Sequence, residues 1–380
     1  MKIGIMAYRQ MPYISANTAI AYTIGNQMAA QGHNVIYIGY KQDKLQNEID
    51  SYDGNKIRYF NKTPKNSPDV LRKIAVKLLG DKYRLREEIT TLKTIVAEEE
   101  LDCIICIFAP LEDAFIAHYA RLDIPVILYQ LDPFYNSMDI ENPKYKEMFK
   151  RIVKNAKYLF TTDLLFDEYR ADNMFKPLLD KISVLQFPKL IKPTLSDASV
   201  DNGKIRLLYA GSLYKKIRSP KILLNLKRCL PENCELVFCG NCDDKDDMTM
   251  LEDSGIICLG YCSQEVLAQE NQKADVLINI GNLVKNQLGS KIIDYIATGK
   301  PILNITQLEH CPTLRALDNY LYKCSVQSDD LEKESTKAQI NEFLQTKNKM
   351  KWDDIYQRYI EYTPEFVANK ILNVITNKEM

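Results

Sequence analysis

The sequence predicts two α/β domains, each built around a parallel sheet. A chain of 380 residues exceeds the size of one ordinary domain and suits two. Short apolar runs alternate with segments of helical periodicity, which is the pattern of parallel strands joined by crossover helices. A stretch rich in Pro, Ser and Gly at residues 188–203 separates two halves that repeat this order. We therefore expect one domain over residues 1–190 and a second over residues 203–350.

The composition is that of a globular protein with no strongly charged partner. Apolar residues make up 46% of the chain and charged residues 26%. Fifty basic residues balance fifty acidic ones, so the net charge gives no reason to expect nucleic-acid binding. A strand-like run starts at Lys2 in place of a signal peptide, and no apolar run approaches the ~20 residues of a membrane span. These features favour a cytoplasmic protein.

The first half contains a series of apolar runs that predict buried strands. A helix is expected at residues 17–30, with Ser15 or Asn17 as its N-cap. Acidic residues follow several of the strands, and functional side chains gather past the carboxyl ends of parallel strands. Each of these acids could equally cap a helix. The expected strands are residues 2–8, 35–40, 57–60, 102–109, 124–130, 158–162 and 182–187, and the acids that follow them are Glu112, Asp113, Asp132 and Asp163.

Residues 68–100 read as a helix, broken near Gly80. Its first half carries apolar residues on one face and Arg72, Lys73 and Lys77 on the other. A basic amphipathic helix can lie on an anionic membrane, but it can also cover a core and turn its charges to water. The second interpretation is preferred, and the first stays open.

The second half centres on a helix expected between Ser290 and Gly299. Ser290 is the predicted N-cap, and Gly299 followed by Pro301 ends the helix. The helix N-terminus, the Ser290 hydroxyl and the Lys291 ammonium together suit an anion. Asp294 lies one turn further along, where it could accept hydrogen bonds from sugar hydroxyls. An ordinary capped helix with a solvated Lys and Asp is the competing interpretation.

A loop after the strand Ile205–Ala210 supplies further cations. Gly211 permits close backbone approach, and Lys215, Lys216 and Arg218 follow within one loop. Three cations on one loop suit a diphosphate, although a basic loop is more often simply solvated. Other strands of this half are expected at residues 235–240, 256–261, 275–280 and 301–305, and the chain beyond Pro312 reads as mostly helical.

The cysteines allow a metal interpretation that we consider weaker. Cys239 and Cys242 are followed by Cys258 and Cys262, a spacing like that of a zinc site. Apolar neighbours instead favour buried, reduced thiols, and we expect neither a metal nor a disulfide here. The acidic run at residues 243–247 is expected to be a surface loop.

Residues 286–301 resemble the donor-binding motif of GT-B glycosyltransferases. They are most similar to family 4-like enzymes of bacterial surface and capsular polysaccharide synthesis, which often read N-x-x-P-S-K, two hydrophobic residues, E-Y, a hydrophobic residue and A-T-G-K-P. This sequence departs from that pattern with Gly289 in place of Pro and Asp294 in place of Glu. Many relatives also carry an acidic residue eight positions before that Glu, and this chain has Asn286 at the corresponding position, eight before Asp294. The start of the chain and residues 211–220 resemble the same family.

The resemblance implies two Rossmann-like domains facing a cleft, with a C-terminal helix, residues 363–380, crossing back to the first domain. It implies a hexosyltransferase-type glycosyltransferase that needs no cofactor or metal and retains the anomeric configuration. The donor would be a nucleotide-diphosphate sugar, with UDP as the expected nucleotide, and the acceptor a hydroxyl of a saccharide or lipid-linked molecule. Peripheral contact with the inner face of the membrane would follow from a lipid-linked acceptor.

The resemblance also assigns roles to residues of this chain. Asp132, Arg218 and Lys291 would be catalytic, and Ser15, Asn17 and Asp132 would bind the acceptor. Two other functions stay open, namely a nucleotide-sugar epimerase and an inactive partner protein that binds a nucleotide-sugar. The donor-binding residues would be Gly211, Ser212, Lys215, Arg218, Tyr261, Asn286, Gln287, Ser290, Lys291 and Asp294.

Overall fold

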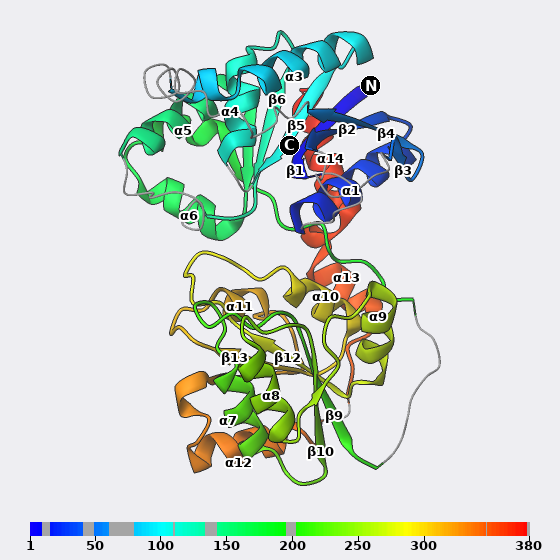
Figure 1. Cartoon of the computed structure of the whole chain (residues 1–380), viewed down its shortest axis with the longest axis vertical. Helices are drawn as coiled ribbons and strands as arrows, with labels where there is room; N and C mark the ends of the chain where they lie inside the picture. Colours follow the sequence, from blue (N-terminus) through cyan, green and yellow to red (C-terminus); the bar gives the residue numbers. More distant parts are fainter. Residues whose placement is uncertain are drawn as a thin grey trace. The chain divides into compact units, whose positions relative to one another are not determined.

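A computed structural model describes residues 1–9, 16–40, 49–60, 80–108, 111–133, 143–194, 203–346 and 348–377. The chain divides into two compact units, each with its own parallel sheet (Figure 1). Unit 1 comprises Met1–Lys189 together with Glu361–Met380, and unit 2 comprises Leu190–Ile360. The last helix therefore belongs to the first unit, although the chain passes through the whole of unit 2 before reaching it.

Sheet A of unit 1 has the strand order β3-β4-β2-β1-β5-β6-β7-β8. All neighbouring strands are parallel except β3 and β4, which form a hairpin around Asp53 and Gly54. Both turn residues have positive φ, as a two-residue hairpin turn requires. This very short hairpin strand was not predicted. The strands are β1 (Lys2–Arg9), β2 (Asn34–Tyr40), β3 (Ser51–Tyr52), β4 (Asn55–Phe60), β5 (Cys103–Phe108), β6 (Val126–Gln130), β7 (Tyr158–Thr161) and β8 (Ile182–Val184).

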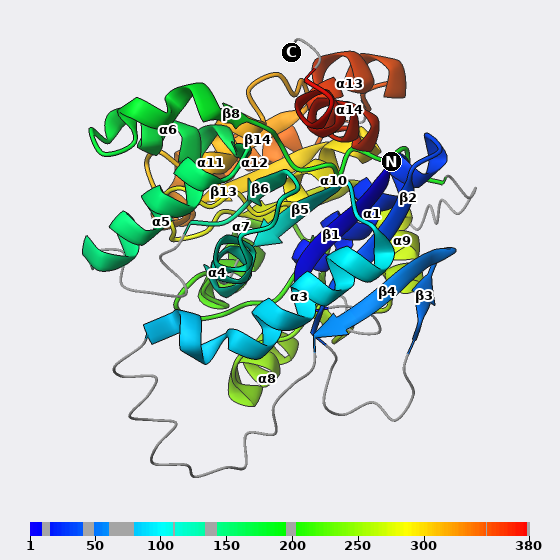
Figure 2. The same cartoon turned by 90° about the horizontal axis from the view of Figure 1, so that it is seen from above.

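Helices cover both faces of sheet A because its central strands are apolar on both sides. Met6, Ile38 and Leu128 belong to a core shared with α3, α4 and α5. On the other face, Tyr37 of β2 donates to the carbonyl of Tyr22 in α1, and α14 packs on α1 (Figure 1). Figure 2 shows α3 and α4 together over sheet A. The unit 1 helices are α1 (Ala16–Ala30), α3 (Arg86–Glu99), α4 (Leu111–Ala120), α5 (Pro143–Asn155), α6 (Asp163–Ala171), the 3-10 helix η2 (Lys176–Lys181) and α14 (Pro364–Ile375).

Sheet B of unit 2 is wholly parallel, with the order β11-β10-β9-β12-β13-β14. Apolar residues of one face pack with α7, α8 and α12, while α9 and α10 lie against the other face. The prediction missed β14, because its polar alternation, Lys-Cys-Ser-Val-Gln, is a weak strand signal. The strands are β9 (Ile205–Ala210), β10 (Cys234–Cys239), β11 (Ile257–Cys258), β12 (Val276–Ile280), β13 (Ile302–Thr306) and β14 (Lys323–Gln327).

The remaining helices of unit 2 occupy the crossovers between these strands and the end of the unit. They are α7 (Lys221–Cys229), α8 (Lys245–Asp253), α9 (Gln264–Lys273), α10 (Lys291–Thr298), α11 (Pro312–Ala316), η3 (Ser328–Asp330), α12 (Glu334–Phe343) and α13 (Trp352–Arg358). The two units together have the doubly wound α/β architecture that the sequence predicted.

The amphipathic segment considered for membrane contact falls largely outside this description. Residues 61–79 are not among the described ranges, so the basic face predicted there stays a prediction. Within the ranges given above, none of the helices combines the length and the apolarity that crossing a membrane would require.

Candidate functional site

The candidate donor site lies where the winding of sheet B reverses direction. From β9 the chain passes to β10 and β11 on one side, and later to β12, β13 and β14 on the other. Loops that leave β9 and β12 at their carboxyl ends therefore diverge, and ligands of doubly wound folds bind at such a point. Gly211 begins the loop after β9, and Gly281 begins the loop after β12.

Helix α10 begins beside this point. Ser290 occupies the predicted N-cap position, but its side chain makes no capping bond to the helix. Gly299 ends the helix with a φ of 72°, in the left-handed conformation predicted for it. In the first turn, the Ile292 and Ile293 amides donate to the carbonyls of Gly289 and Ser290 at 3.1 Å, and the aligned peptide dipoles of the helix give this end partial positive charge.

Two side chains of α10 attach its first turns to the end of β9. Lys291 Nζ donates to the carbonyl of Ala210 at 3.1 Å. One turn later, the Tyr295 hydroxyl accepts from the Ala210 amide at 3.1 Å and donates to the Ala210 carbonyl at 3.3 Å. Burial raises the pKa of Tyr295 well above its ordinary value, so the hydroxyl stays protonated. Tyr295 was not among the predicted site residues. Its i, i+4 spacing from Lys291 on an otherwise apolar face was the available signal.

Arg218 reaches across from the β9–α7 loop to the β12–α10 loop. Its Nε donates to Asn282 Oδ1 at 2.8 Å. Its guanidinium lies so near Gly289 that a Cβ on that glycine would be 3.3 Å from Nη2. Asn282 was not predicted as a site residue, although it directly follows the strand and loop glycine. The bond between Arg218 and Asn282, which are 64 residues apart in sequence, thus holds the Arg218 guanidinium near the N-terminus of α10.

Gly211 lies beneath the Lys291 ammonium. A Cβ on Gly211 would lie 2.8 Å from Lys291 Nζ, and its φ of +153° falls where side chains are strained. The Gly211 amide donates to the Cys239 carbonyl at 2.9 Å, and a Cβ on Gly240 would be 2.2 Å from the Gly211 oxygen. The backbone at Gly211 therefore lies close to the end of β10 and to Lys291, where a side chain on residue 211 would not fit.

The other predicted donor residues are distributed more widely. Lys215 is directed toward α8, where its Nζ lies 3.1 Å from Asp247 and 3.5 Å from Asp244. Those carboxylates, part of the acidic run of residues 243–247, raise the pKa of Lys215. Ser212 contributes its carbonyl to the Tyr209 hydroxyl at 3.5 Å, and Tyr261 is 83% exposed in the loop before α9.

The remaining three donor candidates lie on the loop before α10 and on the helix itself. Gln287 accepts from Asn282 Nδ2 through both its carbonyl and its side chain at 3.4 Å. Asn286 and Asp294 are half-buried. The structure thus groups Gly211, Arg218, Ser290 and Lys291 around one point, and it directs Lys215 away from them.

The expectation of free thiols is wrong for one pair of cysteines. A disulfide joins Cys239 at the end of β10 to Cys262 in the loop after β11. The parallel pairing of β10 and β11 brings these two Cα atoms to 6.2 Å, within the range of a disulfide. Cys242 and Cys258 remain free, and among the described residues no group of three or more potential ligands could hold a metal. The bond ties the Tyr261 loop to the strand that also contacts Gly211.

On the acceptor side, the predicted residues lie at the carboxyl edge of sheet A. Asn17 is in the first turn of α1, which follows β1, and Asp132 follows β6. One strand, β5, separates β1 from β6, which places their ends about 10 Å apart. Gln130 donates to the Asp132 carbonyl and accepts from the buried Tyr169 hydroxyl, which fixes this turn. Ser15 lies outside the described residues.

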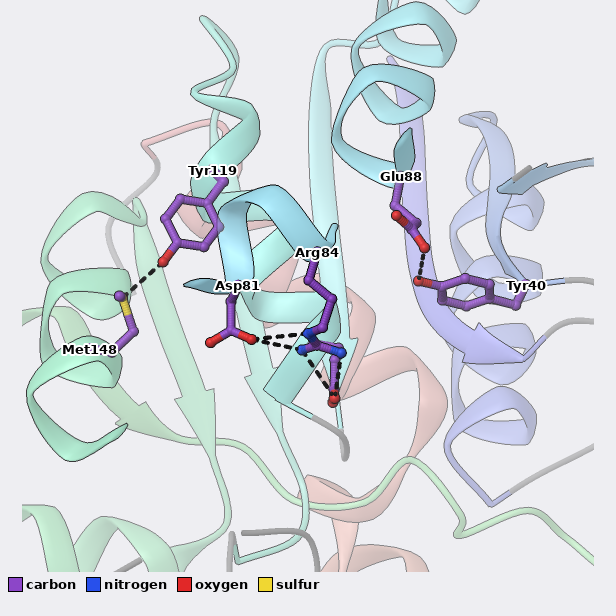
Figure 3. Close-up of polar contacts among 7 residues, drawn as sticks. Tyr40, Asp81, Arg84, Glu88, Tyr119 and Met148 are labelled. Carbon is purple, nitrogen blue, oxygen red and sulfur yellow. Dashed lines mark hydrogen bonds and ion pairs between the residues drawn. The ribbon is translucent and has the colours of Figure 1, made fainter. Parts of the chain in front are cut away.

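The two acids predicted after β5 differ in their surroundings: Glu112 is half-buried in an ion pair, and Asp113 is buried. Figure 3 shows Arg84 bonded to Asp81, and the same guanidinium contacts Glu112 at 3.4 Å. Asp113 is fully buried, and neither of its oxygens has a hydrogen-bond partner in the part of the chain described here. Burial, and secondarily the charge of Glu112, raises the pKa of Asp113 well above its ordinary value. Asp113 therefore favours the neutral acid.

Comparison with known proteins identifies the fold. No protein-family model matches the chain, and no curated protein matches it in sequence. Among solved structures, the galactosyltransferase WaaB of the lipopolysaccharide outer core matches over 100% of both chains, with a TM-score of 0.64 and 14% identity. Anabaena Alr3699/HepE, solved with UDP and glucose, matches over 99% of both chains, with a TM-score of 0.59 and 12% identity.

The fold is not confined to transferases. A protein described as a UDP-N-acetylglucosamine 2-epimerase from Listeria monocytogenes covers 99% of this chain and 96% of its own, with a TM-score of 0.60 and 12% identity. At these identities the likeness concerns fold and not activity. The chain has the GT-B fold, as the resemblance of residues 286–301 predicted.

Proposed function

We propose that the protein is a glycosyltransferase that moves a sugar from a nucleotide-diphosphate sugar, with UDP as the expected nucleotide, to an acceptor hydroxyl. The observation that carries this proposal is the grouping of Arg218, Lys291 and the N-terminus of α10 at the reversal point of sheet B. Two cations and a helix N-terminus form a site for a diphosphate, which carries negative charge at each phosphate. The likeness to a structure that contains UDP and glucose supports the same ligand class.

The proposed mechanism places electrostatic stabilisation on the leaving diphosphate. As the bond between the sugar C1 and the phosphate oxygen breaks, negative charge develops on the diphosphate. Arg218 and Lys291 would offset that charge together with the positive end of the α10 dipole, which supports a reaction that needs no metal ion. Asp294, one turn along α10, would accept hydrogen bonds from the ribose hydroxyls.

The acceptor would bind at the carboxyl edge of sheet A, near Asn17 and Asp132. Asp132 would accept the proton of the attacking hydroxyl. Retention at the anomeric carbon, family 4 membership and a saccharide or lipid-linked acceptor extend the resemblance and remain parts of the proposal. The same holds for a cytoplasmic location with contact to the inner membrane face.

The test is release of the nucleotide from a panel of UDP-, GDP- and dTDP-sugars, with and without acceptor mixtures and EDTA. We expect release from one nucleotide class, and we expect EDTA to leave it unchanged. Arg218→Gln and Lys291→Gln should each lower kcat by roughly 100-fold, as for other donors aimed at developing charge. Arg228→Gln is the matched control, since Arg228 is an exposed cation at the end of α7.

Two outcomes would replace this proposal with its alternatives. Interconversion of two UDP-sugars without release of UDP would identify an epimerase, the activity described for one protein of the same fold. Saturable nucleotide-sugar binding with no turnover under any condition would identify an inactive binding partner. Asn286, which stands where many members of the resembling family carry an acid, is the sequence feature that favours this second alternative.

A further inference from the structure

A separate cavity of about 820 Å³ lies in unit 1 between α4 and α5, over strand β6. Small side chains create it: Ala114 and Ala117 of α4 line it, together with Ala156 directly after α5. The two helices are nevertheless in contact, since the Tyr119 hydroxyl of α4 lies 3.7 Å from Met148 Sδ of α5 (Figure 3). The apolar lining includes Ala114, Ala117, Val126, Leu128, Ile152 and Ala156.

Cations form the other part of the lining. Lys157 Nζ donates to the Ile375 carbonyl at 3.0 Å and to Asn377 Oδ1 at 2.7 Å. Lys181 Nζ donates to two main-chain carbonyls at 2.9 and 3.0 Å. These acceptors are uncharged, so they fix the ammonium groups in place without neutralising them. Each ammonium has a third proton to donate.

No carboxylate among the residues that the structure describes forms an ion pair with Lys157, Lys181 or Arg121. Arg121 is the third cation of the lining, and Asp123 is its one acid. The cavity therefore combines apolar surface with a net positive charge. Such a charge attracts anions most strongly where it is partly shielded from water.

His118 indicates the same local potential. Its Nδ1 is buried and has no hydrogen-bond partner in the ranges that the structure covers. Burial lowers the pKa of His118, and the charges of Arg121 and Arg151 lower it further. A neutral imidazole nitrogen in the cavity lining is a hydrogen-bonding group available to a ligand.

The cavity is distinct from the predicted acceptor residues. Val126 is the first residue of β6, and Lys157 and Lys181 directly precede β7 and β8. The cavity thus lies at the amino ends of these strands. Asp132 and Asp163 follow the carboxyl ends of β6 and β7, at the opposite edge of the sheet.

We propose that this cavity binds a phosphate monoester with an apolar body. Lys157, Lys181 and Arg121 would bind the phosphate, and the alanine-lined hollow would hold the apolar part. The volume is that of a site for one small organic molecule. A lone phosphate would leave the hollow unfilled, and an alcohol of the same size would leave the cations without a counter-ion.

Isothermal titration calorimetry on the full chain with hexyl phosphate tests the proposal. We expect saturable 1:1 binding, at least tenfold tighter than that of hexanol or inorganic phosphate at equal ionic strength. Lys181→Gln should weaken binding at least tenfold, and Ala117→Leu should weaken it as well, because the larger side chain occupies part of the apolar hollow. Lys154→Gln should bind within twofold of wild type, because Lys154 is an exposed cation of α5 that does not line the cavity.

Several results would overturn the proposal. They are an absence of saturable binding to the wild-type chain, equal affinity for hexanol, equal binding by Lys181→Gln, or displacement by UDP. Lys181 is half-buried, so we expect Lys181→Gln to fold, and this variant tests the proposal even if Ala117→Leu does not fold. Sedimentation with phosphatidic acid vesicles then gives the source of the ligand: sensitivity to Lys181→Gln indicates a lipid headgroup, and its absence indicates a soluble ester.

Discussion

Substitution of Tyr295 by Phe tests whether the attachment of α10 to β9 positions the candidate donor site. The variant keeps the ring and removes only the hydroxyl that bonds both the amide and the carbonyl of Ala210. A buried amide that loses its acceptor costs about 1–3 kcal/mol. For a domain of this size, each kcal/mol lowers Tm by about 2–4 °C. The N-terminus of α10 would also lose one of its two contacts with Ala210, so we expect the Kd for UDP to rise about tenfold.

Tyr320→Phe is the matched control for this experiment. Tyr320 is buried in the same unit, and its hydroxyl donates to the Lys300 carbonyl at 2.6 Å, a contact remote from the reversal point of sheet B. We expect a similar loss of Tm by differential scanning fluorimetry and a Kd for UDP within twofold of wild type. If both variants change the Kd equally, the effect is general destabilisation and the positioning argument is refuted.

Three further predictions concern stability. Because the pKa of Asp113 is raised in the folded state, the free energy of unfolding of the wild type should fall as pH rises above about 4, by at most about 1.4 kcal/mol per pH unit. Urea denaturation of Asp113→Asn should show no such decrease, and the same dependence on pH in wild type and variant would contradict the prediction. The buried Lys300 ammonium donates to three carbonyls at the end of α9, and a buried carbonyl that loses its donor costs about 1–3 kcal/mol, so Lys300→Met should lose at least about 3 kcal/mol of stability. Lys333→Met, which breaks an exposed pair with Asp330, should lose less than about 1 kcal/mol, and equal losses would contradict the prediction for Lys300. The Cys239–Cys262 disulfide closes a loop of 23 residues, which by chain entropy stabilises the fold by about 3 kcal/mol, so dithiothreitol should destabilise the wild type by about that amount and leave the stability of Cys262→Ser unchanged. Equal stability of the oxidised and reduced wild type would contradict the prediction.

Local sequence patterns were sufficient for most of the fold. Largely apolar runs such as Ile205–Ala210 predicted strands with the correct limits. The C-terminal helix expected from residue 363 begins there, since Thr363 caps α14 through a bond from the Phe366 amide at 3.2 Å. The patterns failed where local signals are weak. The strand β14 alternates with polar residues, and β3 is only two residues long.

The candidate site was predictable only where its residues are close in sequence. Ser290, Lys291 and Asp294 lie within one turn and a half of the same helix, so their grouping follows from helical geometry. The bonds of Arg218 to Asn282 and of Tyr295 to Ala210 join residues 64 and 85 positions apart. Only the pairing of β9 with β12 brings those segments together. The disulfide was missed for the same reason, since it depends on the pairing of β10 with β11.

The central claim is that a nucleotide diphosphate binds at the N-terminus of α10. Calorimetric titration of UDP into the wild-type chain and into Asp294→Ala tests it most directly. Asp253→Ala, which removes an exposed acid at the end of α8, serves as the control. We predict saturable 1:1 binding, a Kd at least tenfold weaker in Asp294→Ala, and no change in Asp253→Ala. Absence of binding by UDP, GDP and dTDP, or a Kd that Asp294→Ala leaves unchanged, would contradict the account.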